Sequence, residues 1–220
     1  MDDYSLILNA GSSSLKFCVY RRTEKSNWTL QTRGQIDGIG TSPQFTAYDG
    51  HNQLLTRTKL EAAVRDGRAA IDTLASWLRL NYAGARVSVV GHRVVHGGSR
   101  YARPVLVTRE VLVDLYQLIP LAPLHQPYNL AAIDKSMERL PDAHQVACFD
   151  TSFHQSHSPI AKLVPPSRTA TVERVINLLA RILFVSFCWK VHHGRLGANQ
   201  FSRIDTHVPI SFDPYLRPGR

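Results

Sequence analysis

The sequence predicts an α/β domain in which an opening set of paired strands is followed by alternating helices and strands. Short β-forming stretches separated by turn residues fill residues 5–48, whereas residues 60–150 alternate between helical periodicity and compact apolar runs. Hydrophobic residues make up 44% of the 220 positions, which is enough for an ordinary folded core. A disordered or fibrous protein is therefore excluded.

The opening stretch predicts a β-hairpin. Residues 5–9 form a short apolar run that ends in the small-residue cluster at 10–14, and residues 15–20 then alternate between apolar and polar side chains. Further strands are expected at 28–32 and 44–48. Beyond them, apolar residues recur at helical spacing, which predicts a long helix over residues 60–80.

A β-branched strand is expected next, at residues 86–90, and two bounded helices follow it. Thr108 is a suitable N-cap for a helix that Pro120 ends, and Pro127 opens another helix that Pro141 ends. The apolar run after Pro141 predicts a last strand, which closes on a carboxylate.

The last quarter of the chain has a different character. Residues 164–220 contain seven arginines and one lysine against three acidic residues, so +5 of the net charge of +9 lies there. An apolar stretch at 175–191 is interrupted by polar and charged residues and is short for a membrane span. Because no nucleic-acid-binding module accompanies the basic residues, we expect no nucleic-acid partner. Because the apolar stretch is short and interrupted, we expect no membrane association either.

The N-terminus and the cysteines indicate a cytoplasmic protein. Residues 1–4 are acidic where a secretory signal would be basic. Cys18, Cys148 and Cys188 are too few and too scattered for a disulfide framework or a zinc site. Their apolar neighbours predict buried thiols that serve as core packing.

Residues 9–16, Asn-Ala-Gly-Ser-Ser-Ser-Leu-Lys, combine an amide, three hydroxyls and a cation at the end of a strand. Such a loop can surround phosphoryl oxygens with donors, and Gly11 permits close backbone approach. The spacing is neither that of a P-loop nor that of a dinucleotide-binding loop. Phosphate binding and an ordinary serine-rich hairpin turn both fit the pattern.

Arg93 ends a strand within Gly-His-Arg-Val-Val-His-Gly-Gly, residues 91–98. A guanidinium at the mouth of a sheet suits a carboxylate or a phosphate, because its planar fork donates two hydrogen bonds at once. Strand alternation places Arg93 and Val95 on one face, which suits a short carboxylic acid. The alternative is an arginine paired with a structural acid.

Two further residues could carry chemistry. His125 lies between two prolines in residues 121–127, where it could donate to a developing phosphoryl charge or be an ordinary surface residue. Asp150 follows a strand, which is a normal position for a metal-binding or base residue in α/β sheets. A capping role is the alternative for this aspartate.

Taken together, the four segments 9–16, 91–98, 121–127 and 147–154 resemble the motifs of acetate kinases, in the same order along the chain. The resemblance covers residues 4–163. It implies a ribonuclease H-like fold of the acetate kinase, sugar kinase, Hsp70 and actin superfamily, in which two such domains enclose a cleft. It also implies reversible phosphoryl transfer from ATP to acetate, giving acetyl phosphate and ADP, with Mg²⁺ as cofactor.

The resemblance also implies roles for individual residues. Asn9 would help to hold Mg²⁺ and the phosphates, and Arg93 would bind the substrate carboxylate or the phosphoryl group. His125 would stabilise the transferring phosphoryl group, and Asp150 would be the essential acid near the metal. Ser12, Ser14 and Lys16 would line the phosphate loop. Val95 and Leu124 would form the wall around the methyl group of acetate.

The chain departs from the family pattern after residue 163. We therefore expect a family domain at 1–163 and a non-matching basic tail at 164–220, of the kind that a frameshift or truncation produces. The resemblance implies a Tyr-Gly-Phe-His-Gly-type segment with a catalytic histidine soon after residues 147–154, and His192-His193-Gly194 does not replace it. We therefore expect impaired activity and doubt that this chain forms the family homodimer. One alternative is a catalytically dead remnant that binds phosphate or a partner. Within the kinase class, the alternative is a propionate kinase.

Overall fold

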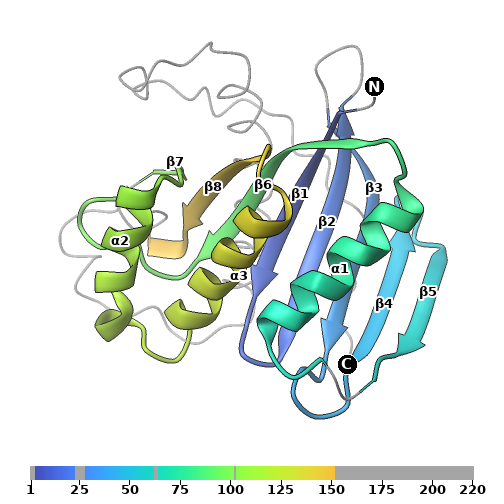
Figure 1. The fold of residues 1–220 in the computed structure, drawn as a ribbon, viewed down its shortest axis with the longest axis horizontal. Coiled ribbons are helices and arrows are strands. Elements are labelled where there is room, and N and C mark those ends of the chain that lie inside the picture. The colour runs from blue at the N-terminus through green and yellow to red at the C-terminus, as the bar shows by residue number, and fades with distance from the viewer. Residues whose placement is uncertain (1–2, 23–27, 62–63, 102, 152–220) are drawn as a thin grey trace, which may run out of the picture.

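The computed structural model describes residues 3–22, 28–61, 64–101 and 103–151 (Figure 1). Their strands are β1 (Asp3–Ala10), β2 (Ser14–Arg22), β3 (Trp28–Asp37), β4 (Gln44–Asp49), β5 (Leu54–Lys59), β6 (Arg86–Val94), β7 (Val105–Leu106) and β8 (His144–Phe149). Their helices are α1 (Gly67–Asn81), α2 (Arg109–Gln117), the 3-10 turn η1 (Ile119–Leu121) and α3 (Gln126–Arg139).

All eight of these strands form one mixed sheet in the order β5-β4-β3-β2-β1-β6-β8-β7. Strands β1 to β5 pair with one another in antiparallel fashion, whereas β6 is parallel to both of its neighbours, β1 and β8. Short β7 adds an antiparallel edge to β8. The carboxyl ends of these three neighbouring strands, β1, β6 and β8, therefore lie side by side at the same end of the sheet (Figure 1).

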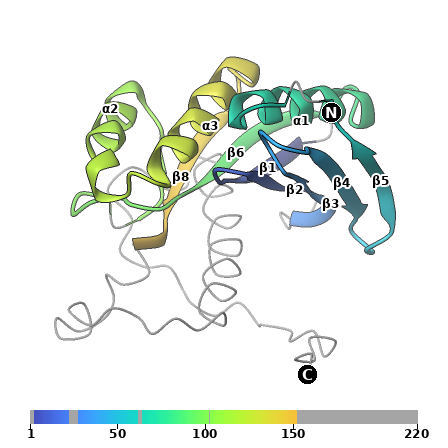
Figure 2. The same ribbon diagram turned by 90° about the horizontal axis from the view of Figure 1, so that it is seen from below.

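The three described α-helices lie on the same face of the sheet (Figure 2). A first core fills the space between α1 and strands β1 to β4, and it includes Leu8, Phe17 and Leu74. A second core under α2 and α3 includes Leu130 and Phe149. Because side chains alternate along a strand, Leu6, Leu8 and Ala10 face the helices whereas Asn9 projects from the opposite face.

The structure confirms the predicted hairpin and the strands expected near residues 28–32 and 44–48, and it corrects one helix boundary. Helix α1 begins at Gly67 rather than near residue 60, because the Asp66 side chain accepts a hydrogen bond from the Ala69 amide and caps it there. Strand β5, Leu54–Lys59, precedes this helix and was not predicted from the sequence. This edge strand exposes both of its leucines, so it lacks the alternation that marks a half-buried strand.

The prediction of the later elements is largely confirmed. Strand β6 continues to Val94, beyond the expected end near residue 90. The Thr108 hydroxyl accepts from the Val111 amide and caps α2, and Pro120 lies in η1 after that helix has ended. Pro127 lies in the first turn of α3.

Among the described residues, no helix is long and apolar enough to cross a membrane. The predictions for residues 164–220, including Cys188 and His192-His193-Gly194, lie outside the described part of the chain.

His92 joins the two parallel strands β6 and β8 within the core. Its Nε2 lies 2.8 Å from Oε1 of Gln145, and both residues are buried on the helix side of the sheet. The Gln145 amide group donates in turn to the carbonyls of Leu140 and Ala143. Burial lowers the pKa of His92 to about 4, with the hydrogen bond to Gln145 opposing part of this shift.

This buried histidine predicts a specific pH dependence of stability. Between pH 6.5 and pH 4 the unfolded chain binds a proton at His92 that the folded chain does not, so stability falls as the pH falls through this window. The full effect is about 3 kcal/mol. Urea unfolding at several pH values should show this loss in the wild type and in the exposed-site control His51→Gln. In His92→Gln the additional loss should be absent, and a wild-type curve parallel to that of His92→Gln would contradict the assignment.

Candidate functional site

Three polar side chains from distant parts of the chain meet where the parallel strands end. Asn9 lies near the end of β1, Arg93 near the end of β6 and Asp150 directly after β8. Arg93 Nε lies 3.0 Å from both carboxylate oxygens of Asp150, and Nη2 lies 2.7 Å from Oδ2. Arg93 Nη1 also donates to the Asn9 amide oxygen over 3.3 Å.

The geometry leaves Arg93 able to bind a further group. A guanidinium carries five N–H donors, of which Nε–H and one N–H on each Nη are used by Asp150 and Asn9. Among the described residues, one donor on each terminal nitrogen makes no hydrogen bond. The Arg93 and Asp150 side chains are 29% and 19% exposed, so the pair is reachable from solvent but partly desolvated. A planar pair of donors in such a setting suits a carboxylate or a phosphoryl group.

The phosphate-loop candidates adjoin this centre through the β1–β2 hairpin. Lys16 is the register partner of Asn9, so the two side chains project from the same face on neighbouring strands. The turn is closed by the Gly11 amide, which donates to the Ser14 carbonyl over 2.8 Å. Ser12 and Lys16 are exposed and Ser14 is half-buried, which leaves the loop open to solvent.

Two buried side chains at the start of α3 fix the strand ends. The Asn129 amide nitrogen donates to the Ala10 carbonyl over 2.7 Å, and its oxygen accepts from the Val95 amide over 3.1 Å. Gln126 pairs with the His96 backbone, accepting from its amide over 3.2 Å and donating to its carbonyl over 3.0 Å. Helix α3 therefore ties the end of β1 to the segment that follows β6.

The sequence interpretation did not identify Asn129 or Gln126 as site-supporting residues. Each lies four positions before a core residue of α3, Gln126 before Leu130 and Asn129 before Ile133. A polar residue on the core face of a helix must find buried partners. The position of Gln126 and Asn129 on the core face of α3 is therefore the sequence signal that could have identified them.

The glycine pair after β6 is required by close packing. A Cβ atom on Gly97 would lie 2.4 Å from the Tyr101 carbonyl oxygen and 2.8 Å from the Phe149 ring. Gly98 has φ +62°, which side chains disfavour. The Gly97 amide donates to the Thr151 hydroxyl over 3.2 Å, so the segment is also tied to the residue after Asp150.

Three further site candidates, Val95, Leu124 and His125, make no hydrogen bond to the side chains of Arg93 and Asp150 among the described residues. Strand β6 ends at Val94, so the alternation that placed Val95 beside Arg93 stops one residue too early. Leu124 is 75% exposed, and His125 is exposed at the start of α3. Within the described residues, no hydrogen bond joins the His125 imidazole to Arg93 or Asp150.

Neither of the two described cysteines is a reactive thiol at this site. Cys18 is buried as predicted, whereas Cys148 is half-buried on β8 beside Arg93 in register. Desolvation, and next the negative charge of Asp150, hold the pKa of the Cys148 thiol well above its usual range. The thiol therefore stays protonated at neutral pH.

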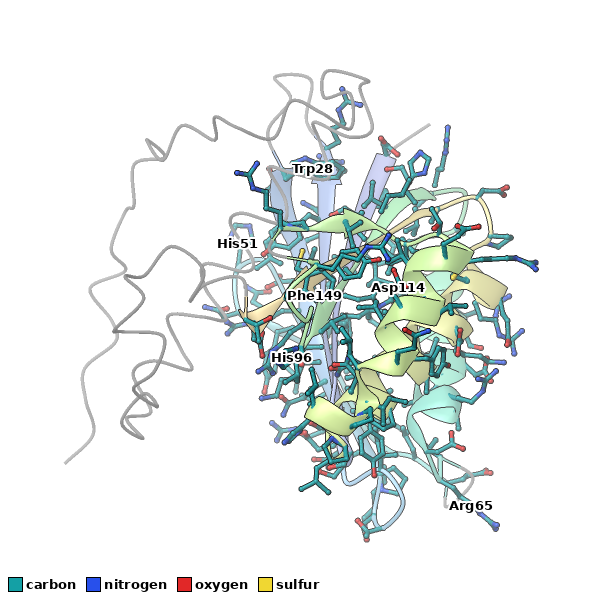
Figure 3. All side chains as sticks on the ribbon, turned by 90° about the vertical axis from the view of Figure 1, so that its left-hand side faces the viewer. Trp28, His51, Arg65, His96, Asp114 and Phe149 are labelled. Carbon is teal, nitrogen blue, oxygen red and sulfur yellow. The ribbon has the colours of Figure 1, made fainter. Side chains whose placement is uncertain are left out.

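Figure 3 shows the described side chains on the ribbon and labels His96, which follows β6, and Phe149, the last residue of β8. In the described part of the chain, no group of three or more His, Cys, Asp or Glu side chains could hold a metal ion. The oxygen donors available are the Asp150 carboxylate and the Asn9 amide. Mg²⁺ commonly uses one or two such protein oxygens and completes its shell with phosphates and water.

Comparison with known proteins identifies the family. The model of the acetokinase family matches residues 4–176. The chain belongs to the acetokinase family. The acetate kinase of Rhizobium meliloti is 52% identical over 158 residues, which are 71% of this chain and 39% of that protein. The chain thus spans about two fifths of the length of this relative.

Solved structures confirm the fold class. Porphyromonas gingivalis acetate kinase superimposes with a TM-score of 0.62 at 25% identity, over 80% of this chain and 43% of its own. A propionate kinase from Francisella tularensis gives 0.61 at 28% identity over the same shares. The mixed sheet therefore belongs to the ribonuclease H-like fold of the acetate kinase, sugar kinase, Hsp70 and actin superfamily, as predicted.

The packing at Gly97 predicts a large cost for adding a single methyl group. Gly97→Ala should lower the free energy of unfolding by about 2 kcal/mol or more, because the Tyr101 carbonyl and the Phe149 ring must both move. Gly67→Ala is the matched control, since no atom lies within 4 Å of the place that its Cβ would take and alanine favours a helix. Chemical denaturation measures both, and equal effects would contradict the packing argument.

The Asn129 bridge predicts a second loss of stability. Asn129→Ala leaves the Ala10 carbonyl and the Val95 amide without their side-chain partner, which should cost about 2 to 4 kcal/mol. Asn81→Ala removes one hydrogen bond, to the exposed Trp77 carbonyl, and should cost less than about 1 kcal/mol. Thermal and urea unfolding of both variants test this. A cost for Asn129→Ala no larger than that of Asn81→Ala would refute the bridging role.

Proposed function

We propose that this chain carries the carboxylate-binding side of an acetate kinase, which transfers the γ-phosphoryl group of ATP reversibly to acetate to give acetyl phosphate and ADP. The observation that carries the proposal is the Arg93–Asp150 pair at the ends of β6 and β8, in which two guanidinium donors make no hydrogen bond to any described residue. Membership of the acetokinase family supports it. By this proposal the protein acts in the cytoplasm.

The chemistry requires positioning more than it requires a base. A carboxylate oxygen is already a nucleophile, so the barrier falls mainly through orientation and through neutralisation of the phosphoryl charge. The two free donors of Arg93 would hold an oxygen of acetate or of the transferring group. Asp150 would fix the plane of the guanidinium by accepting hydrogen bonds from Nε and Nη2. Asn9 would hold the remaining nitrogen, Nη1.

The nucleotide brings a divalent cation into this proposal. Asn9 and Asp150 are the side chains that would hold Mg²⁺, which supplies charge neutralisation to the β- and γ-phosphates when bound. Ser12, Ser14 and Lys16 would donate to phosphoryl oxygens from the hairpin. Lys16 is suited to this because its ladder partner is Asn9.

The roles of three residues in this proposal come from the family resemblance. His125 would donate to the phosphoryl group in transfer, and Val95 and Leu124 would surround the methyl group of acetate. The exposure of Leu124 and His125 is compatible with a surface that a nucleotide-bearing domain covers. The similarity to a propionate kinase makes propionate the first alternative substrate to compare.

A second candidate function is non-catalytic binding of phosphate or of a partner. It is favoured by the Arg93–Asp150 pair itself, because a guanidinium held in this way can bind a phosphate or a carboxylate without any nucleotide.

One experiment separates the two candidates. ADP release from MgATP is measured with the 220-residue chain in the presence of acetate or propionate, and acetyl phosphate binding is measured by phosphorus NMR. Arg93→Ala should reduce turnover by about a hundredfold or more, because it removes a donor to the developing charge. The control Arg109→Ala removes an exposed arginine from the start of α2 and should change neither quantity.

Arg93-dependent turnover would support the kinase, and the preference between acetate and propionate would name its substrate. Arg93-dependent binding without turnover would support the second candidate. The absence of both turnover and acetyl phosphate binding would rule out both.

A further inference from the structure

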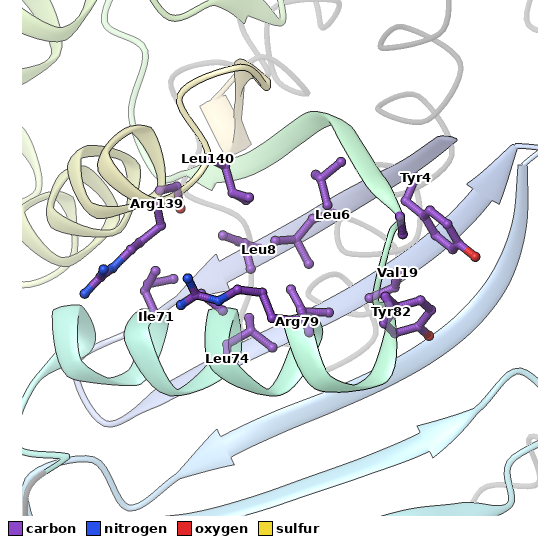
Figure 4. A pocket seen from close by; sticks show the side chains of 15 residues that line it. Tyr4, Leu6, Leu8, Val19, Ile71, Leu74, Arg79, Tyr82, Arg139 and Leu140 are labelled. Atoms are coloured by element: carbon purple, nitrogen blue, oxygen red, sulfur yellow. The ribbon is translucent and has the colours of Figure 1, made fainter. Parts of the chain in front are cut away.

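A second concave site lies on the helix side of the sheet, away from Arg93 and Asp150. It is a cavity of about 130 Å³ between α1, α3 and strands β1, β2 and β6 (Figure 4). Leu6, Leu8 and Leu74 form part of its apolar wall and are themselves buried. Its size is close to that of apolar cavities that accept one benzene ring.

One end of the cavity is closed by two tyrosines. The rings of Tyr4 and Tyr82 pack edge to face with centroids 5.2 Å apart, and the Tyr82 hydroxyl is hydrogen-bonded to Thr32 over 2.5 Å. That phenol therefore already has a partner. The wall at this end is aromatic and rigid.

The cavity wall contains a buried hydroxyl without a partner. Ser136 is 1% exposed, lines the cavity, and its Oγ makes no hydrogen bond within the described part of the chain. A serine inside a helix usually bonds back to the carbonyl one turn earlier, which this one does not do. A buried hydroxyl left unsatisfied costs free energy, so a polar atom of a ligand in the cavity would gain by meeting it.

Two arginines mark the solvent side of the cavity. Arg79 and Arg139 both line it and are exposed or partly exposed, and Figure 4 shows them extending toward the same side of the cavity, near Ile71. Arg139 is paired with Asp72, whereas Arg79 makes no ion pair or hydrogen bond with the described residues.

The charges next to this opening do not balance. Arg139 belongs to an ion-pair chain in which three cations, Arg68, Lys135 and Arg139, share the two carboxylates of Asp72 and Glu138. Arg79 adds a further positive charge from the last turn of α1. An anionic group is therefore favoured at the mouth, while the interior favours an apolar body, with room for one polar atom beside Ser136.

We infer that this cavity is a binding site for a small amphipathic carboxylate, with a ring or a short hydrocarbon chain against the leucines and a carboxylate at Arg79. The site is independent of the proposed phosphoryl transfer, because Arg93 and Asp150 lie on the other face of the sheet. The ligand is larger and more apolar than acetate, which would leave most of the cavity empty.

Fluorine NMR with 4-fluorobenzoate and the full chain tests this inference. We expect saturable binding with a Kd on the order of 1 mM, as befits a fragment-sized ligand. The neutral analogue 4-fluorotoluene should bind about tenfold more weakly, because it lacks the charge-assisted hydrogen bond to Arg79.

Two pairs of variants locate the binding. Ala75→Leu fills the cavity from α1 and should weaken binding at least about tenfold, whereas Ser76→Leu adds the same side chain at an exposed neighbouring position and should not. Arg79→Ala should weaken binding about tenfold, whereas Arg65→Ala, which removes the same charge from an exposed loop, should leave it unchanged.

The folded state of each variant is checked by its thermal unfolding midpoint, and the NMR titration is repeated with Arg93→Ala. Binding that survives in Ala75→Leu and Arg79→Ala would overturn the inference. Binding lost in Arg93→Ala alone would also overturn it, because the probe would then occupy the acetate site. Failure of the proposed kinase activity would leave these binding results unaffected, so the two proposals fail separately.

Discussion

Parallel pairing of β1, β6 and β8 is the constraint on which the candidate site depends. It brings together Asn9, Arg93 and Asp150, although 84 and 57 residues separate Arg93 from the other two. A slip of one residue in β6 would turn Arg93 into the core and His92 out of it. The buried pair of His92 and Gln145 opposes that slip from the helix side, and Asn129 fixes the strand ends from α3. The site is thus held by buried polar groups that do not themselves reach it.

The sequence was sufficient to predict which residue types end which strands. The small-residue turn after Asn9, the glycine pair after Arg93 and the carboxylate after the last apolar run are local signals, and the structure places all three at strand ends. For Arg93 the sequence left two alternatives, a substrate carboxylate or a structural acid. The structure shows that the acid is Asp150 and that two donors make no hydrogen bond within the described part of the chain, so the alternatives are compatible.

Other features depend on contacts that no local pattern contains. The partners of Asn129 are backbone groups of Ala10 and Val95, more than 30 positions away, and only the assembled sheet brings them within reach. Strand β5 was missed because edge strands can be exposed on both faces. Asn9 and Lys16 were predicted on either side of the hairpin turn, but which residues of the two strands lie opposite each other is a matter of register, and the structure pairs these two.

The ion pair at the site also has a consequence at long range. Arg93 and Asp150 cancel each other's charge when seen from more than a Debye length away, so together they exert little pull on an anion in solution. Of the charged side chains assigned to the site, only Lys16 is left to attract one from a distance, and its exposure subjects that attraction to screening by salt. In the proposed function, capture of an anion would therefore fall to Lys16 and its recognition to Arg93. Ionic strength would then act on the rate of encounter through the lysine, while geometry would set the fit at the guanidinium.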